Sequence, residues 1–225
     1  MCGRFIQYSD PEIYAEQFGL DEIDAIAPSY NAAPSQQIMI IRRRPAGGRQ
    51  LLPVRWGLIP SWSKGPDSRY SMINARAETV ADKPAYRTAF RRRRCLIPSE
   101  GFYEWRALSD GKQPYLIRRK DQAPFAMAGL WEVWQGPDGG PVESCSIIVT
   151  DADAAIRPVH DRMPVVLSPD NHDAWLDPAN QDFQALTAML KPADSNDWAL
   201  HPVSKRVNSP RNNDQELLLA VLDPV

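Results

Sequence analysis

Short stretches of alternating apolar and polar residues, separated by turn residues, make up most of this chain, and this pattern is typical of β-strands. The alternation predicts strands over residues 2–7, 38–42, 51–56, 95–97, 103–107, 115–119, 125–134, 146–150 and 163–167. A turn over residues 45–48 separates the second and third of these strands and predicts a hairpin. Many short strands separated by turns at this spacing are typical of an all-β barrel or sandwich.

Helical spacing of apolar residues predicts four helices, over residues 10–19, 82–93, 168–176 and 183–190. In the first, Pro11 opens the helix, Tyr14 and Phe18 share one face, and Gly19 ends it. In the second, Asp82 is the expected N-cap. Strands with a few helices predict the α+β class, with a mixed or barrel-like sheet.

The composition is that of a folded globular protein, with 43% hydrophobic and 24% charged residues. No shift in composition marks a boundary, so we expect one domain over residues 1–225. No apolar run approaches the ~20 residues that span a bilayer, and the N-terminus lacks an apolar signal core. We therefore expect no membrane partner and a monomer in the cytoplasm, associated with the nucleoid if the source is a bacterium.

Cysteine and histidine are scarce and lie in no metal-binding pattern. The three cysteines form no CxxC pair, and the three histidines are not spaced as metal ligands usually are. The residues are Cys2, Cys95 and Cys145, and His160, His172 and His201. The sequence therefore predicts neither a disulfide framework nor a zinc site, and we expect no cofactor.

The net charge of −2 conceals a strong local bias. Residues 42–94 contain fourteen lysines and arginines but three acidic residues, a local net charge of +11. Twelve of the fourteen are arginines, which suit bidentate phosphate contacts and stacking on bases. The stretch favours a polyanionic partner about as much as it favours an ordinary solvated face, and the run of arginines over 91–94 could be the exposed end of a helix.

Cys2 directly follows the initiator methionine, and a small second residue normally allows that methionine to be removed. The mature chain would then begin with an amine of reference pKa about 7.7 to 8.0 and a thiol of about 8.5 on the same residue. Such a 1,2-aminothiol condenses with an aldehyde to an imine and then to a thiazolidine ring. The thiol could instead attack an amide, as in hydrolases with an N-terminal nucleophile, or Cys2 could be incidental.

Three further side chains have chemistry that a site could use. His160 lies in a polar cluster and titrates near neutrality, although a lone histidine is more often a surface residue. Glu104 lies among aromatic residues; a buried carboxyl there would have a raised pKa, whereas an outward-facing one would not. Asn74 could hold a polar intermediate by hydrogen bonds or could cap a turn.

Seven segments together resemble one family, the SOS-response-associated peptidase (SRAP) family, whose members shield abasic sites in DNA. The segments are MCGRF (1–5), YNAAP (30–34), WGLIPSW (56–62), NARAET (74–79), GFYEW (101–105), HDRMP (160–164) and HPVS (201–204). They occur in family order and span nearly the whole chain, apart from residues 63–72 and 177–198, which match less closely.

The resemblance implies a pseudo-barrel with a positively charged channel for single-stranded DNA that ends at the mature N-terminal cysteine. It implies that the Cys2 amine and thiol form a thiazolidine crosslink with the abasic aldehyde, after removal of Met1. It assigns Asn74 to positioning the sugar and amine, Glu104 to proton transfer, and His160 to protonating the opening sugar. The implied DNA contacts are made by Arg4, Trp62, Arg76, Trp105 and Arg162.

Two other functions remain open at this point. A cysteine-type peptidase or amidase could use Cys2, His160 and Glu104 and would not need the basic stretch. A non-catalytic protein that binds single-stranded DNA would need the arginines but not Cys2.

Overall fold

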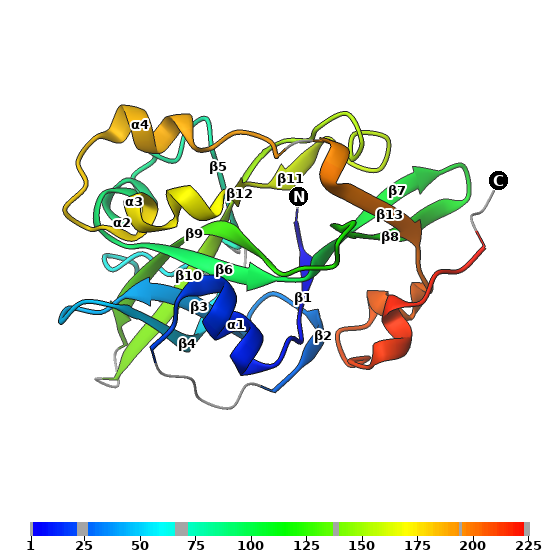
Figure 1. Ribbon diagram of the computed structural model, residues 1–225, viewed down its shortest axis with the longest axis horizontal. Coiled ribbons are helices and arrows are strands. Elements are labelled where there is room, and N and C mark those ends of the chain that lie inside the picture. The colour runs from blue at the N-terminus through cyan, green and yellow to red at the C-terminus, as the bar shows by residue number, and fades with distance from the viewer. Residues whose placement is uncertain (1, 22–26, 66–71, 137–139, 194, 223–225) are drawn as a thin grey trace.

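The computed structural model describes residues 2–21, 27–65, 72–136, 140–193 and 195–222. Its strands are β1 (Arg4–Gln7), β2 (Ser29–Ala32), β3 (Gln37–Arg43), β4 (Arg49–Trp56), β5 (Asn74–Arg76), β6 (Arg94–Ser99), β7 (Gly101–Leu108), β8 (Gly111–Arg119), β9 (Phe125–Gln135), β10 (Pro141–Asp151), β11 (Arg162–Pro164), β12 (Val166–Leu167) and β13 (Trp198–Pro202) (Figure 1). Its α-helices are α1 (Pro11–Phe18), α2 (Arg87–Arg92), α3 (His172–Leu176) and α4 (Phe183–Ala188).

The strands form two sheets, and the larger one closes on itself. In the larger sheet the order is β11-β10-β4-β3-β6-β9-β12, with β5 beside β10. Because β9 also pairs with β10, the strands β10, β4, β3, β6 and β9 form a closed ring. The second sheet has the order β13-β8-β7-β1-β2 and is antiparallel. The expected α+β architecture with a barrel-like mixed sheet is confirmed, since β10 runs parallel to β4 and β5.

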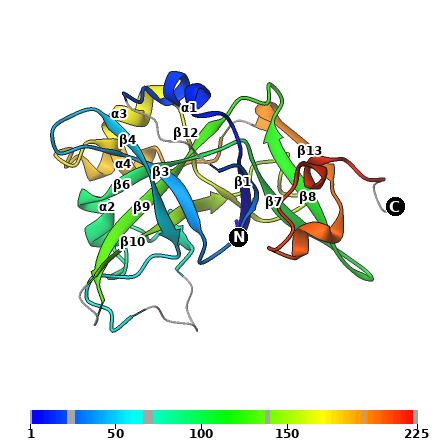
Figure 2. The ribbon, with the colours of Figure 1, turned by 90° about the horizontal axis from the view of Figure 1, so that it is seen from below.

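Apolar side chains cover both faces of the closed sheet, which explains the long apolar run of β9. Met127 and Ile147 pack into one hydrophobic cluster together with Phe5 and Trp56, whereas the next residues along β9 and β10, Ala128 and Ile148, pack into another. Successive residues of a strand point to opposite faces. The second cluster lies under the helices, and α1 and α3 lie next to one another at the top of Figure 2, where the Phe18 and His172 rings are 5.9 Å apart.

The first helix and the hairpin follow the sequence prediction. Helix α1 begins at Pro11, buries Tyr14 and Phe18, and ends at Gly19. Gly19 has a left-handed backbone with φ of 61°, and its amide donates to the carbonyl of Ala15. Strands β3 and β4 pair in antiparallel register around the predicted turn.

The second helix is shorter than predicted, and Asp82 is not its N-cap. Helix α2 covers Arg87–Arg92, and Tyr86 precedes it. The amides of Asp82 and Lys83 both donate to the carbonyl of Thr79, so this segment is a turn. Pro84 disfavours a helical backbone at the residue before it, and this delays the helix.

Three other predicted elements also differ from the structure. The strand expected over residues 163–167 is divided into β11, which pairs with β10, and β12, which pairs with β9. Val165 lies at the crossing, where its amide donates to Ile148 and its carbonyl accepts from Ala128. The helix expected over 168–176 begins as a 3-10 turn, and α4 ends two residues before the predicted position.

Candidate active site

Cys2 lies two residues before Arg4, the first residue of β1, and β1 pairs with β7 so that Arg4 is opposite Tyr103. The Cys2 side chain is fully buried, and its Sγ donates a long hydrogen bond of 3.9 Å to the Arg4 carbonyl. Burial and then the charge of Glu104 raise the pKa of the thiol above its ordinary value. In the chain that carries Met1, the thiol is therefore neutral at pH 7.

Glu104 is a buried carboxyl on β7, 2% exposed, between Tyr103 and Trp105. Of the two possibilities that the sequence left open, burial is the correct one. Burial raises the pKa of Glu104 to about 7, and the charge of Asp161 acts in the same direction. A carboxyl with this pKa can both accept and donate a proton at neutral pH.

His160 lies beside Glu104, with its Nε2 3.9 Å from the Glu104 Oε2. Its Nδ1 accepts a hydrogen bond from the backbone amide of Arg162 at 3.0 Å and lies 2.9 Å from the Asp161 Oδ1. Because an amide can only donate, the neutral ring carries its proton on Nε2, on the side of Glu104; the charged ring would donate from Nδ1 to Asp161. Burial lowers the pKa of His160.

Asn74 connects this cluster to the start of the chain. It is the first residue of β5, which is inserted parallel to β10 with Asn74 opposite Ile147. The Asn74 Nδ2 donates to the Cys2 carbonyl at 2.8 Å, and the Tyr86 hydroxyl donates to the Asn74 carbonyl at 3.0 Å. The buried Asn74 Oδ1 accepts no hydrogen bond from the described residues, so it can accept one from a bound molecule.

The burial of Glu104 has a measurable cost in stability. Its carboxyl keeps a proton up to pH about 7 in the folded chain but only to about 4.5 when unfolded, so the folded state binds more protons between these values. The free energy of unfolding should therefore fall as pH rises from about 4.5 to about 7, by up to about 3 kcal/mol from this group. In Glu104→Gln this part of the fall should be absent, as urea unfolding at pH 5 and pH 8 would measure. An equal pH dependence in both proteins would contradict the raised pKa.

An open cleft of about 540 Å³ lies next to this cluster. The residues that line it are Gly3, Arg4, Pro34, Glu104, Trp105, Lys112 and His160. Three of the residues predicted as catalytic, Cys2, Glu104 and His160, thus lie at or directly beside the cleft, and Asn74 reaches them through the Cys2 carbonyl.

The residues predicted to contact DNA lie in different environments. Arg4 and Trp105 line the cleft, whereas Trp62, Arg76 and Arg162 lie outside its lining. Arg76 is exposed on β5, and Trp62 is 68% exposed. Arg162 forms ion pairs with Glu78 and, at 3.3 Å, with Asp151. Its charge is therefore already shared with carboxylates.

The loop that carries Trp62 is hydrogen-bonded to the barrel on either side of that residue, at Ile59 and at Ser63. The indole Nε1 of Trp134 donates to the Ser63 carbonyl at 2.7 Å, and the Ile59 amide donates to the Ser144 Oγ at 2.9 Å. The loop therefore holds the exposed Trp62 ring outward, where its faces can stack on a base.

The basic stretch is partly neutralised by acids from distant parts of the chain. Arg42 pairs with Glu143 at 2.6 Å, Arg49 with Asp173 at 2.9 Å, and Arg93 with Glu132 at 2.8 Å. Arg94 is buried and donates to backbone carbonyls, including that of Trp175. The interpretation of residues 91–94 as an exposed helix end is therefore wrong for Arg94.

One cleft residue, Lys112, carried no signal in the sequence. Lys112, which follows the tight turn between β7 and β8, lines the cleft with Glu104, as do Gly3 and Pro34. A lysine beside a turn glycine has no distinctive pattern, and its place at the cleft depends on the pairing of β7 with β8.

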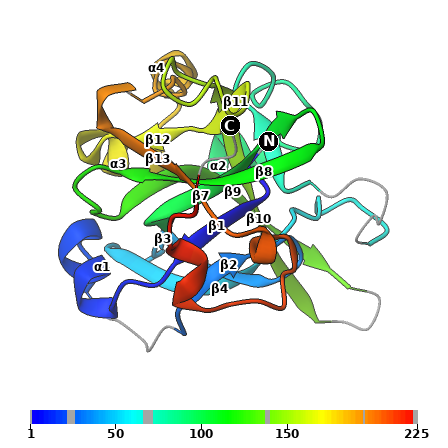
Figure 3. The ribbon, with the colours of Figure 1, turned by 90° about the vertical axis from the view of Figure 1, so that its right-hand side faces the viewer.

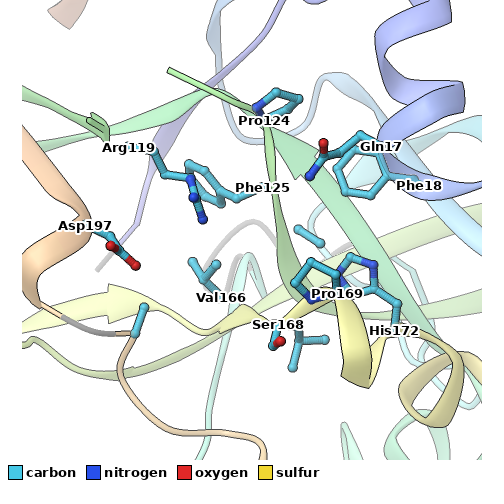
Figure 4. A pocket seen from close by; sticks show the side chains of 13 residues that line it. Gln17, Phe18, Arg119, Pro124, Phe125, Val166, Ser168, Pro169, His172 and Asp197 are labelled. Atoms are coloured by element: carbon cyan, nitrogen blue, oxygen red, sulfur yellow. The ribbon is translucent and has the colours of Figure 1, made fainter. Parts of the chain in front are cut away.

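A second pocket, of about 280 Å³, lies between α1, β9, β12 and α3 (Figure 4). Phe18, Phe125 and Pro169 line it, together with His172 and Arg119, which already forms a bidentate pair with Asp121. It contains none of the residues predicted to be catalytic.

In the described part of the chain, no group of three or more His, Cys, Asp or Glu could hold a metal ion, and no helix there has the length and apolar character needed to cross a membrane.

Comparisons with known proteins agree with the resemblance noted in the sequence. The family described as "SOS response associated peptidase (SRAP)" matches residues 1–210. The abasic site processing protein YoqW of Bacillus subtilis is 44% identical over 222 residues, which cover 97% of this chain and 99% of YoqW. The abasic site processing protein HMCES of Gallus gallus is 33% identical over 86% of this chain and 66% of its own length.

A solved structure has the same fold. The crystal structure of a protein from Bacteroides thetaiotaomicron superimposes with a TM-score of 0.87 at 26% sequence identity and covers 98% of this chain and 100% of that one.

Proposed function

Because this chain belongs to the SOS response associated peptidase (SRAP) family, we propose that it processes abasic sites in single-stranded DNA by forming a covalent thiazolidine link through a mature N-terminal Cys2. The observation that carries the proposal is that Cys2, Asn74, Glu104 and His160, from four separate segments, form one cluster beside a cleft that Glu104 and His160 line. The names of the relatives YoqW and HMCES support abasic sites as the substrate.

The chemistry needs a free Cys2 amine, so Met1 is removed first by hydrolysis of the Met1–Cys2 peptide bond. The amine then attacks the C1′ aldehyde of the ring-opened sugar, and loss of one water gives an imine. The thiol adds to the imine carbon, and its proton moves to the nitrogen, which closes the five-membered ring. The whole condensation releases one water and needs no oxidant or reductant.

Each neighbouring side chain has a role that fits its geometry. Glu104, with its pKa near 7, accepts a proton as the amine attacks and returns it to the departing hydroxyl. The same carboxyl assists hydrolysis at Met1. His160, whose neutral ring carries the Nε2 proton, donates to the opening sugar oxygen. The Asn74 Oδ1 accepts from the reacting amine while its Nδ2 holds the Cys2 carbonyl.

DNA binding follows from the cations and the exposed indole around the site. Arg4 and Arg76 contact phosphates, while Trp62 and Trp105 stack on bases. Arg162 also faces DNA but adds less positive charge, because it is already paired with Glu78 and Asp151. All parts of the site come from one chain, which supports a monomer as the active form.

The proposed role of Arg76 can be tested by the salt dependence of binding. Phosphate neutralisation releases counterions from single strands with a slope of log K against log salt of about −0.7 per contact. Arg76→Ala should make this slope shallower by about one contact. Fluorescence anisotropy with an undamaged oligonucleotide measures it, and Lys83→Ala is a suitable comparison because Lys83 is, like Arg76, an exposed cation but is not among the residues proposed to contact DNA. An unchanged slope in Arg76→Ala would remove Arg76 from the interface.

A denaturing gel tests the proposed reaction. The protein is incubated with three single-stranded oligonucleotides: one with an abasic site, one with a tetrahydrofuran analogue that has no aldehyde, and one intact. A heat-stable adduct should form with the first alone. Adducts with all three, or with none, would contradict the proposal, and cleavage of unrelated peptides without any adduct would favour a peptidase.

A further inference from the structure

The C-terminal segment, here residues 203–221, lies across the second sheet and forms hydrogen bonds with two residues that line the cleft. Figure 3 shows this segment, coloured orange to red, in front of β1 and β2. Val207 and Leu217 are fully buried against Ile6 and Tyr103, so the segment has its own small core. The segment is therefore packed in a fixed place on the second sheet, beside two residues that line the cleft, Arg4 and Trp105.

Arg4 and Trp105 both line the cleft and are called the rim residues here. Arg4 is held by the C-terminal segment and by Asn31 through neutral oxygen atoms. Its Nη1 donates to the Val207 carbonyl at 2.6 Å and to the Asn31 Oδ1 at 2.9 Å, and its Nη2 donates to the Asn208 carbonyl at 3.1 Å. No carboxylate of the described residues forms an ion pair with it. The Arg4 charge is therefore fixed in position but not neutralised, in contrast to that of Arg162.

Asn31, on β2, also holds the C-terminal segment in place. Its Nδ2 lies within hydrogen-bond distance of three carbonyls of the segment, those of Val207 at 3.2 Å, Ser209 at 3.0 Å and Asn212 at 2.9 Å. Asn31 is buried. The turn that contains Asn208 is thus held in one place relative to β1 and β2.

Trp105, the second rim residue, is held by the Asn208 side chain. The indole Nε1 donates to the Asn208 Oδ1 at 2.8 Å. Trp105 has two rotatable side-chain bonds, and this hydrogen bond fixes the direction in which its ring faces. Asn208 therefore contacts both rim residues at once, Arg4 through its backbone and Trp105 through its side chain.

We propose that Asn208 is a positioning residue for DNA, which sets the Trp105 ring beside the unneutralised Arg4 so that a base and its neighbouring phosphate are bound together. This inference rests on the proposed function, because it assigns the rim to single-stranded DNA. A prearranged rim avoids the loss of side-chain freedom that binding would otherwise require.

The test is a double-mutant cycle with Asn208→Ala and Trp105→Phe, which removes the indole N–H but keeps an aromatic ring. Affinity for a labelled, undamaged single-stranded oligonucleotide is measured by fluorescence anisotropy. Loss of one neutral hydrogen bond predicts a fall of about three- to tenfold for each single variant. The double variant should bind no more weakly than the weaker single one, because both changes remove the same contact. Asn208→Ala should lower the crosslinking rate at saturating abasic DNA by less than twofold.

The matched control is Asn212→Ala. The Asn212 side chain donates to the Arg206 carbonyl within the same segment and forms no hydrogen bond with Arg4 or Trp105, so this variant should bind as the wild type does. Wild-type affinity in Asn208→Ala, or effects of Asn208→Ala and Trp105→Phe that add fully, would overturn the proposal. If the two substitutions have non-additive effects on the affinity for undamaged DNA but the wild type forms no adduct with abasic DNA, the proposed function is contradicted and this inference still stands.

Discussion

Cys2→Ala should form less than about 1% of the wild-type heat-stable adduct with abasic DNA, because it lacks the thiol that closes the ring. If Met1 is still removed, the variant keeps an amine and can form a reversible imine. Borohydride should trap that imine, whereas the wild type should need no reductant. Adduct yield on a denaturing gel, with and without borohydride, separates the two cases.

The controls for Cys2→Ala separate chemistry from binding. Cys2→Ser should give a weak version of the wild-type result, because a hydroxyl closes the analogous ring poorly. Both variants should still bind undamaged single-stranded DNA. A heat-stable adduct of Cys2→Ala that forms without reductant in wild-type yield would show that the thiol closes no ring.

Glu104→Gln should slow crosslinking by about 10²- to 10⁴-fold, the usual contribution of a positioned general acid or base. The carboxylate form has to be present when the amine attacks, so the wild-type rate should rise as pH increases through about 7. In Glu104→Gln this rise should be absent, and only the titration of the Cys2 amine, with an ordinary pKa of about 7.7 to 8.0, should remain. Single-turnover rates from about pH 5 to about pH 9, roughly two units either side of the Glu104 pKa, would measure both profiles.

Glu100→Gln is the matched control for Glu104→Gln. Glu100 is also a buried carboxyl with a raised pKa, but it accepts from the Tyr14 hydroxyl and the Tyr8 amide and does not line the cleft. Its replacement should leave the pH midpoint of crosslinking unchanged. The role of Glu104 would be contradicted if Glu104→Gln crosslinked at the wild-type rate. It would also be contradicted if Glu100→Gln lost the rise in crosslinking rate through about pH 7.

The strands that the sequence predicts well are those with strong local patterns. Strand β9 buries both faces along most of its length and has a long apolar run bounded by turns, whereas the prediction over 146–150 covers only the apolar part of β10 (Pro141–Asp151). The short strands β2, β5 and β13 were not predicted, because they exist through pairing with distant segments, as β13 does with β8. Their own residues show no clear alternation, so the local pattern could not reveal them.

The site was predictable in its residue types but not in its electrostatics. Glu104 stands out as a charge among aromatic residues, yet only the fold determines that it is buried. The excess of arginines over residues 42–94 left a polyanionic partner and an ordinary solvated face equally open, and the sequence did not show that Arg42, Arg49 and Arg93 pair with acids far away in the chain. Likewise, the role of Asn208 depends on the path of the C-terminal segment over the second sheet, which no local motif encodes.

The central claim, a ring closed by the mature Cys2, is tested most directly by intact mass spectrometry of the protein mixed with an abasic single-stranded oligonucleotide. The account predicts one adduct whose mass equals the chain without Met1 plus the oligonucleotide minus one water, formed without a reductant and stable to heat. An adduct that retains Met1, or unmodified protein beside intact oligonucleotide, would contradict it.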